Sequence, residues 1–199
     1  EGVKYGYIDS VKQLFSSSFQ NLDNMFVNRI DCSGKLTFRD STERMLIPFA
    51  VNKRGKIVEL ELGSSLTAHG LLSGGTGSGK SSLLHALISS VMMHYRPEDV
   101  QLWLVDYKLA EFSVYLNNTP RNIKLVGVQD SEEFTYAFLD YVTAEYNRRV
   151  GLFKEATKEQ GVAVSSIQEY RKYYGKDSMP RILIIVDEFH KMTQYIQDN

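Results

Sequence analysis

Apolar and polar positions alternate in two neighbouring stretches of the chain and predict a β-hairpin. Met45–Val51 and Lys56–Leu62 are β-rich runs, and the second alternates apolar with polar side chains. Between them, Asn52-Lys53-Arg54-Gly55 forms a turn in which Gly55 can take a positive φ. We expect this hairpin to cover an edge of a larger sheet.

Continuous apolar runs predict the strands of that larger sheet. They are Val100–Val105, Ile123–Val128 and Arg181–Val186, and the last is apolar on both faces, as is typical of a central parallel strand. A shorter run, Ala68–Ser73, predicts a buried strand before a glycine-rich loop, and apolar positions at helical spacing predict a helix after it, up to Tyr95. This order of strand, loop, helix, turn and strand predicts the βαβ unit of a parallel α/β sheet.

Capping residues and glycines delimit the remaining predicted helices. Ser131, with two acids directly after it, starts a long helix whose pattern breaks at Gly161. Ser166 caps a short helix, Ile167–Tyr174. Residues 1–30 include an amphipathic helix that either packs on the following domain or serves as a linker or subunit contact.

Length and composition fit one globular domain with a small appendage. The chain has 199 residues, of which 43% are hydrophobic and 24% charged. We divide it into an N-terminal helical or linker segment, residues 1–45, and an α/β core, residues 46–199. Because the chain has no initiator Met and ends soon after its last apolar run, we expect it to be a piece of a longer protein whose core is C-terminally truncated.

Charge and cysteine content restrict the environment and the partners. The net charge is −1, from 23 basic and 24 acidic side chains, so any contact with nucleic acid must be local. Cys32 is the single cysteine and cannot form an intrachain disulfide, which fits a reducing compartment. No apolar run approaches the length of a membrane-spanning helix, and we therefore expect a cytoplasmic domain.

The glycine-rich loop matches the phosphate-binding pattern G-x-x-x-x-G-K-[ST]. The predicted nucleotide-binding residues are Gly74, Gly75, Thr76, Gly77, Ser78, Gly79, Lys80, Ser81 and Ser82. Glycines let the backbone approach a phosphate closely, and the helix that follows presents its positive end to the anion. Lys80 is expected to reach the β- and γ-phosphate oxygens, and Ser81 to bind Mg²⁺. The pattern therefore predicts a site for ATP and Mg²⁺, and the alternative is a glycine-rich turn that binds nothing.

Two acids follow the last apolar run and suit the second half of such a site. Asp187 is predicted to complete the Mg²⁺ shell with Ser81, and Glu188 to orient or deprotonate the attacking water. We expect the end of this strand to lie beside the phosphate loop. Nucleotide kinases and small GTPases do not generally place a water-activating Glu there, so hydrolysis is favoured, with Glu188 and Lys80 as catalytic residues.

Two further polar pairs are candidates with two interpretations each. Asp106 and Lys108 follow the apolar run from Val100, where they either belong to the ligand-binding edge or form a local ion pair that closes a turn. Arg148 and Arg149 on the long helix either face a partner subunit or polyanion or belong to a solvated helix face.

Four segments resemble the motor domain of the FtsK/SpoIIIE family, in the family's order. They are His69–Ser81, Val105–Tyr115, Glu145–Arg149 and Val186–Phe189. The resemblance covers residues 46–192. Tyr107 stands where the family usually has Pro, and the segment Leu116–Asp130 is longer than usual, which leaves the subfamily open.

The resemblance implies a RecA-like P-loop NTPase fold, a mostly parallel sheet flanked by helices, and self-association into a hexameric ring with ATP at the subunit interfaces. It implies translocation of double-stranded DNA through the ring as the first function. A type VII protein-secretion ATPase and a non-hydrolysing nucleotide-binding repeat are the alternatives, and the intact Lys80, Ser81, Asp187 and Glu188 argue against the last.

The resemblance also implies which parts of the motor lie elsewhere. The sensor residue, the arginine supplied to a neighbouring subunit, much of the pore lining and any membrane anchor would lie outside this chain. Because that arginine supplies a large part of the catalysis, the isolated chain is expected to bind nucleotide weakly and hydrolyse it slowly.

Overall fold

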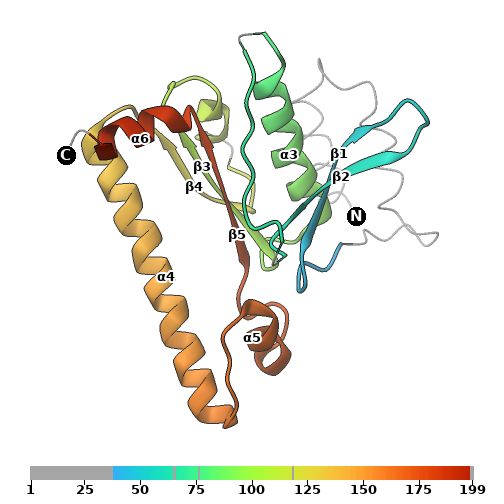
Figure 1. The fold of residues 1–199 in the computed structure, drawn as a ribbon, viewed down its shortest axis with the longest axis vertical. Helices are drawn as coiled ribbons and strands as arrows, with labels where there is room; N and C mark the ends of the chain where they lie inside the picture. The colour runs from blue at the N-terminus through green and yellow to red at the C-terminus, as the bar shows by residue number, and fades with distance from the viewer. Residues whose placement is uncertain (1–37, 65, 76, 118, 198–199) are drawn as a thin grey trace. The chain divides into compact units, whose positions relative to one another are not determined.

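The computed structural model forms two compact units (Figure 1). It describes residues 38–64, 66–75, 77–117 and 119–197. The first unit ends at Tyr95 and the second begins at Arg96. The helix predicted within residues 1–30 lies outside the described residues, and the boundary predicted between residues 45 and 46 stays a prediction.

The predicted hairpin is confirmed in the first unit. Strand β1 (Met45–Val51) pairs antiparallel with β2 (Ile57–Leu62). In the turn, Gly55 has a φ of 75°, and the Asn52 side-chain oxygen accepts backbone N–H bonds from Arg54 and Lys56 at 2.9 and 3.0 Å. The turn is therefore fixed by a positive φ and by one amide side chain. Its predicted place at an edge of the larger sheet stays a prediction.

Helix α3 (Lys80–His94) confirms the predicted helix and lies against β1. Its Ile88 and Val91 are fully buried. Tyr95, directly after the helix, donates its hydroxyl to the Leu46 carbonyl at 3.0 Å and accepts the Leu46 N–H at 2.7 Å. Apolar packing and this reciprocal bond thus fix the end of α3 to the first strand.

The predicted strand before the glycine-rich loop is wrong. Residues Ala68–Ser73 are exposed, with Leu71 86% exposed, and the sheet of their unit contains only β1 and β2 among the described residues. A strand forms only where its backbone groups bond to a neighbouring strand, and a short apolar run does not specify such a neighbour. The predicted βαβ unit is therefore present only from its helix onward.

The second unit contains a three-stranded parallel sheet in the order β4-β3-β5. Its strands are β3 (Val100–Asp106), β4 (Ile123–Val128) and β5 (Arg181–Asp187). The prediction that β5 is central is wrong for the described sheet, because β3 occupies the centre and β5 an edge, with Ile184 36% exposed. An apolar run predicts burial, whereas the position in a sheet depends on which strands pair.

Helices cover this sheet and extend beyond it. They are α4 (Glu132–Gln160), α5 (Ile167–Tyr174), α6 (Phe189–Gln197) and the 3₁₀ turn η1 (Phe112–Tyr115). The Ser131 and Ser166 caps and the Gly161 break are confirmed, whereas α6 and η1 were not predicted. Figure 1 places α6 beside the beginning of α4 and α5 beside its end. None of the helices in the described part of the chain is long and apolar enough to cross a membrane.

Two hydrophobic clusters hold the second unit together. The first covers one face of the sheet with residues of all three strands, α4 and α6, centred on Trp103, Val105, Tyr107 and Phe138. The second lies at the far end of α4 and is centred on Ala156, Val164, Tyr170 and Met179. In the first cluster a Cβ on Gly127 of β4 would collide with the Phe134 ring, so glycine is required there for close packing.

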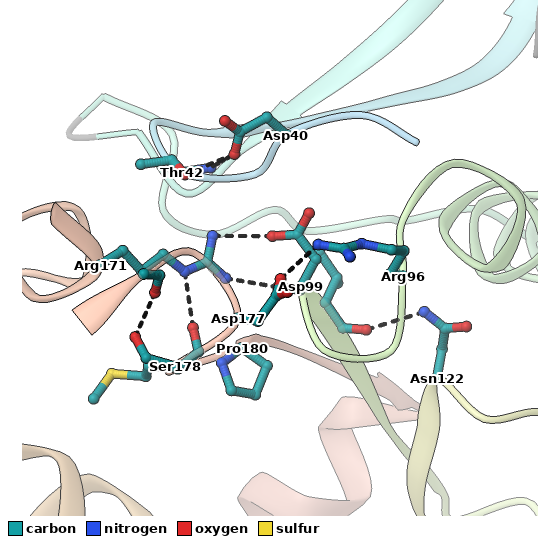
Figure 2. Close-up of polar contacts among 12 residues, drawn as sticks. Asp40, Thr42, Arg96, Asp99, Asn122, Arg171, Asp177, Ser178 and Pro180 are labelled. Atoms are coloured by element: carbon teal, nitrogen blue, oxygen red, sulfur yellow. Dashed lines mark hydrogen bonds and ion pairs between the residues drawn. The ribbon is translucent and has the colours of Figure 1, made fainter. Parts of the chain in front are cut away.

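A buried ion pair joins α5 to the beginning of the sheet (Figure 2). The Arg171 Nη1 lies 3.0 Å from Asp99 Oδ1, and both side chains are at most 1% exposed. Arg171 also donates to the carbonyls of Met179 and Asp99, both at 2.9 Å. Because Asp99 precedes β3 and Met179 precedes β5, this one guanidinium fixes α5 to the starts of two strands.

Replacing Arg171 by Met is expected to lower the free energy of unfolding by about 3–5 kcal/mol, since Asp99 would keep a buried charge without its guanidinium. Urea unfolding at neutral pH measures the effect. Lys at this position should not restore stability, because an ammonium cannot reproduce the planar set of bonds.

The matched control is Arg96→Gln, which removes the exposed 2.5 Å pair with Asp177 at the same end of the sheet. It should change the free energy by less than about 1 kcal/mol. Equal effects of the two substitutions would contradict the special role of the buried pair.

Candidate functional site

The phosphate loop is exposed and ends at the beginning of α3. Gly77 and Gly79 have φ values of 76° and 87°, in the left-handed region that favours glycine. The Ser78 N–H donates to the Gly75 carbonyl at 3.1 Å, and a Cβ on Gly74 would lie too close to Ser78 Oγ. Gly77 and Gly79 therefore have a conformational reason, whereas the Ser78 hydroxyl could rotate away from a side chain at Gly74. Thr76 lies outside the described residues.

The beginning of α3 fits an anionic phosphate group. Gly79 is the N-cap residue and makes no side-chain bond to the helix, and the first turn contains no acidic side chain. The first-turn N–H groups are thus not capped by that residue, and the helix dipole favours a negative charge there. Lys80 and Ser81 begin the helix and are partly exposed. This is the arrangement that a nucleotide phosphate requires.

Asp187 and Glu188 lie at the carboxyl end of β5. Asp187 is 2% exposed and lies opposite Asp106 of β3 in the parallel register. Glu188 follows with a φ of 55°, in the left-handed region, which a residue with a side chain rarely adopts. The Lys191 N–H closes this turn by donating to the Glu188 carbonyl at 2.9 Å.

Asp106 has a structural environment at the same edge. Its buried carboxylate accepts backbone N–H bonds from Lys108, Ala110 and Phe112 at 2.7, 3.0 and 3.1 Å. Asp106 thus bonds to the Lys108 backbone and holds the loop after β3 in place, while the Lys108 side chain is exposed. The turn is therefore closed by backbone N–H bonds to Asp106, and the interpretation that Asp106 and Lys108 belong to a ligand-binding edge stays a prediction.

The second unit therefore brings Asp106, Lys108, Asp187 and Glu188 to one edge of its sheet. The phosphate loop belongs to the first unit, and its expected place beside the end of β5 stays a prediction.

A model of the FtsK/SpoIIIE family matches residues 32–195. The chain belongs to the FtsK/SpoIIIE family. The ESX-1 secretion system protein EccCa1 of Mycobacterium tuberculosis is 30% identical over 164 residues, which are 76% of this chain and 22% of that protein. The DNA translocase FtsK of Clostridium tetani is 34% identical over 148 residues, which are 71% of this chain and 18% of that protein.

A solved relative supports the same fold. The cytoplasmic domain of the Thermomonospora curvata type VII secretion ATPase EccC matches 80% of this chain and 19% of that chain, with a TM-score of 0.66 and 26% sequence identity. The predicted α/β class is confirmed, and the chain is an ATPase-family domain of the FtsK/SpoIIIE type. It spans about a fifth of the length of each of these relatives.

Tyr107, where the FtsK/SpoIIIE family usually has Pro, is part of the core. It is fully buried, and its hydroxyl forms a 2.9 Å hydrogen bond with Thr135 Oγ1 of α4. Burial raises the pKa of its hydroxyl, which therefore stays protonated at neutral pH. The departure from the family pattern thus ties the end of β3 to the first turn of α4.

A cluster that sequence reasoning missed lies at the same edge of the sheet. Asp130, in the loop after β4, forms a close ion pair with Lys191 of α6 and accepts the Tyr195 hydroxyl at 3.0 Å. The hydrogen bond from Lys191 lowers the pKa of the Asp130 carboxyl and raises that of the lysine. Asp130 and Lys191 are far apart in the sequence, so only the order of the strands brings them together.

Arg148 and Arg149, in the segment that resembles a family helix, both bind Glu145 of α4. Arg149 Nε donates to Glu145 at 2.7 Å and its Nη2 donates to the Pro180 carbonyl at 2.9 Å, while the more exposed Arg148 makes two bonds to the same carboxylate. Contacts within the chain therefore occupy the Arg149 guanidinium. The hydrogen bond from Arg148, together with that from Arg149, lowers the pKa of Glu145 to about 2.

Replacing Glu145 by Gln is expected to lower the free energy of unfolding by about 1–2 kcal/mol at pH 7, because charge-assisted bonds to two arginines are lost. The folded-state pKa is depressed from 4.5, so this stabilisation is present above pH 4.5 and is lost as the pH falls toward 2.

Urea unfolding of both proteins at neutral pH and near pH 3 measures the difference. The difference in free energy of unfolding between wild type and Glu145→Gln should be smaller at the lower pH. The control is Glu155→Gln, which replaces an exposed acid on the same helix. A difference that does not depend on pH would rule out the ionic explanation.

Proposed function

We propose that this chain is the ATP-binding and ATP-hydrolysing part of a ring-forming FtsK/SpoIIIE-type motor. The observation that carries the proposal is the phosphate loop, with left-handed glycines at 77 and 79 and a helix start free of acidic side chains. The buried Asp187 and the adjacent Glu188 support hydrolysis, because they end a strand of a parallel sheet, where such folds hold ligands.

The proposed roles follow from residue chemistry. The loop backbone, from Gly74 to Ser82, would bind the phosphates, and Lys80 would neutralise the β- and γ-phosphate oxygens. Ser81 and Asp187 offer the oxygen ligands that Mg²⁺ prefers, and the bound ion would neutralise charge on the phosphates. Glu188 would activate water. The exposed Lys108 is an additional candidate, on the loop that Asp106 holds.

Replacing Glu188 by Gln is expected to preserve ATP binding and to reduce hydrolysis by about a hundredfold or more, since general-base catalysis contributes that much. Fluorescent-nucleotide titration and phosphate release in the full-length protein measure the two effects. Lys80→Ala should instead remove most of the affinity, because it deletes the cation of the phosphate loop.

The matched control is Glu98→Gln, which replaces an exposed acid in the turn before β3. It should change neither ATP binding nor ATP hydrolysis. Equal loss of binding and hydrolysis in Glu188→Gln would mean that Glu188 is structural. Unchanged ATP binding by Lys80→Ala would contradict the proposed nucleotide site. ATP binding without hydrolysis by the wild-type protein would favour a non-hydrolysing repeat.

As the substrate we propose first a polypeptide exported by type VII secretion, and double-stranded DNA second. This reverses the order that the sequence resemblance implied. The secretion-system relative EccCa1 matches 76% of the chain and the DNA translocase 71%, with identities of 30% and 34%, and the solved structure that matches the fold is a type VII secretion ATPase. A net charge of −1 also provides no general attraction for a polyanion.

ATP hydrolysis by the full-length protein should therefore rise with the secreted polypeptide of its own system and not with linear double-stranded DNA. Phosphate release with each polymer, at low and physiological salt, is the measurement, because nonspecific DNA binding weakens steeply with salt. Stimulation by DNA alone would restore DNA translocation as the first function.

A further inference from the structure

The turn that carries Glu188 is strained and needs support from its surroundings. Its φ of 55° places a residue with a side chain in the left-handed region, which costs roughly 1–2 kcal/mol. Such a conformation persists only when neighbouring structure fixes it. Helix α6 begins at the next residue, and the Lys191 N–H closes the turn. The position of α6 therefore determines the position of Glu188.

Apolar packing explains only in part how α6 is held, because none of its residues is fully buried. Met192 and Tyr195 pack on the first cluster only as partly buried side chains. The remaining restraint is polar. The two oxygens of Asp130 accept one bond each from Lys191 and Tyr195, which lie four residues apart on the same face of α6. This carboxylate, together with the Tyr136 hydroxyl that donates to the Tyr195 carbonyl at 3.4 Å, thus restrains one turn of the helix.

Lys191 has two functions in this arrangement. Its backbone N–H bonds to the Glu188 carbonyl inside the strained turn, and its ammonium group bonds to Asp130 on the neighbouring connection. The side chains of Lys191 and Asp130 are 36% and 24% exposed. Because ion pairs this exposed contribute little to global stability, the pair is better placed to fix a local conformation than to hold the fold together.

The Glu188 carboxylate has an alternative partner nearby. His190 Nδ1 lies 3.2 Å from Glu188 Oε2, on a side chain that is 63% exposed. A carboxylate engaged with this imidazole is not free to accept a proton from water. The structure shows this contact while the Asp130 contacts are intact, so those contacts fix the backbone turn of Glu188 and the start of α6 rather than the partner of the carboxylate.

We propose that Asp130, Lys191 and Tyr195 are positioning residues that hold α6 so that Glu188 can activate water, an inference that rests on the hydrolytic function proposed above. They act through the turn and not on the nucleotide. Their loss should therefore lower kcat without weakening ATP binding.

The experiment uses the full-length protein with Asp130→Asn and Lys191→Met, singly and together. Each should reduce kcat by about 10- to 100-fold, as misplacement of a catalytic group by about 1 Å does, with KM and the Kd for a fluorescent ATP analogue unchanged. The double variant should lose no more than either single variant, since the two residues act as one unit. Lys191→Arg, which retains a cation, should recover most of kcat.

The control is Asp177→Asn, which breaks the partly exposed pair with Arg96 before the starts of β3 and β5 and should leave kcat unchanged. Normal kcat in Asp130→Asn and Lys191→Met overturns the positioning role if Glu188→Gln abolishes hydrolysis in the same assay. Parallel loss of kcat, ATP affinity and thermal stability overturns it in favour of a structural role. Full hydrolysis by Glu188→Gln would instead overturn the proposed function itself.

Discussion

The parallel pairing of β3 with β5 is the constraint on which the second unit depends. It runs without interruption from Val100 opposite Arg181 to Asp106 opposite Asp187. A shift of one residue would turn every side chain of β5 to the other face and move Asp187 away from its position opposite Asp106. The same register brings the segments before the strands together at the other edge, where Asp99 accepts the Arg181 N–H at 2.9 Å.

The two edges of this sheet are built differently. The edge where the strands begin is closed by the buried Arg171–Asp99 pair, in which the guanidinium also bonds to the carbonyls of Met179 and Asp99. At the edge where the strands end, Leu109 and Glu188 are the non-glycine residues with positive φ in the described part of the chain. Each follows one of two neighbouring strands. Strain is thus confined to the edge that carries the candidate catalytic groups, as is common at functional sites.

Local signals in the sequence were sufficient to predict most elements. Helix α5 was predicted with its observed bounds because Ser166 caps it and Gly175 ends it, and in the structure Glu169 completes a capping box with Ser166. The predictions that failed, and the contacts that were not predicted, depend on residues far apart in the sequence. The edge position of β5 and the unpaired Ala68–Ser73 segment follow from which strands pair, and the Asp130–Lys191 pair joins two connections that only the fold makes neighbours. The phosphate loop was recognisable because its chemistry is confined to consecutive residues.

Helix α4 links the two edges of the sheet. Thr135, Phe138 and Ala156 are the fully buried residues among its 29, and polar contacts add to its packing in the two hydrophobic clusters. Near its middle, Arg149 bonds to the Pro180 carbonyl, directly before β5 begins. At its start, the neighbouring Asp130 bonds to Lys191, shortly after β5 ends. The helix is therefore attached beside both ends of the strand that presents Asp187 and Glu188, and the orientation of that strand depends on both attachments.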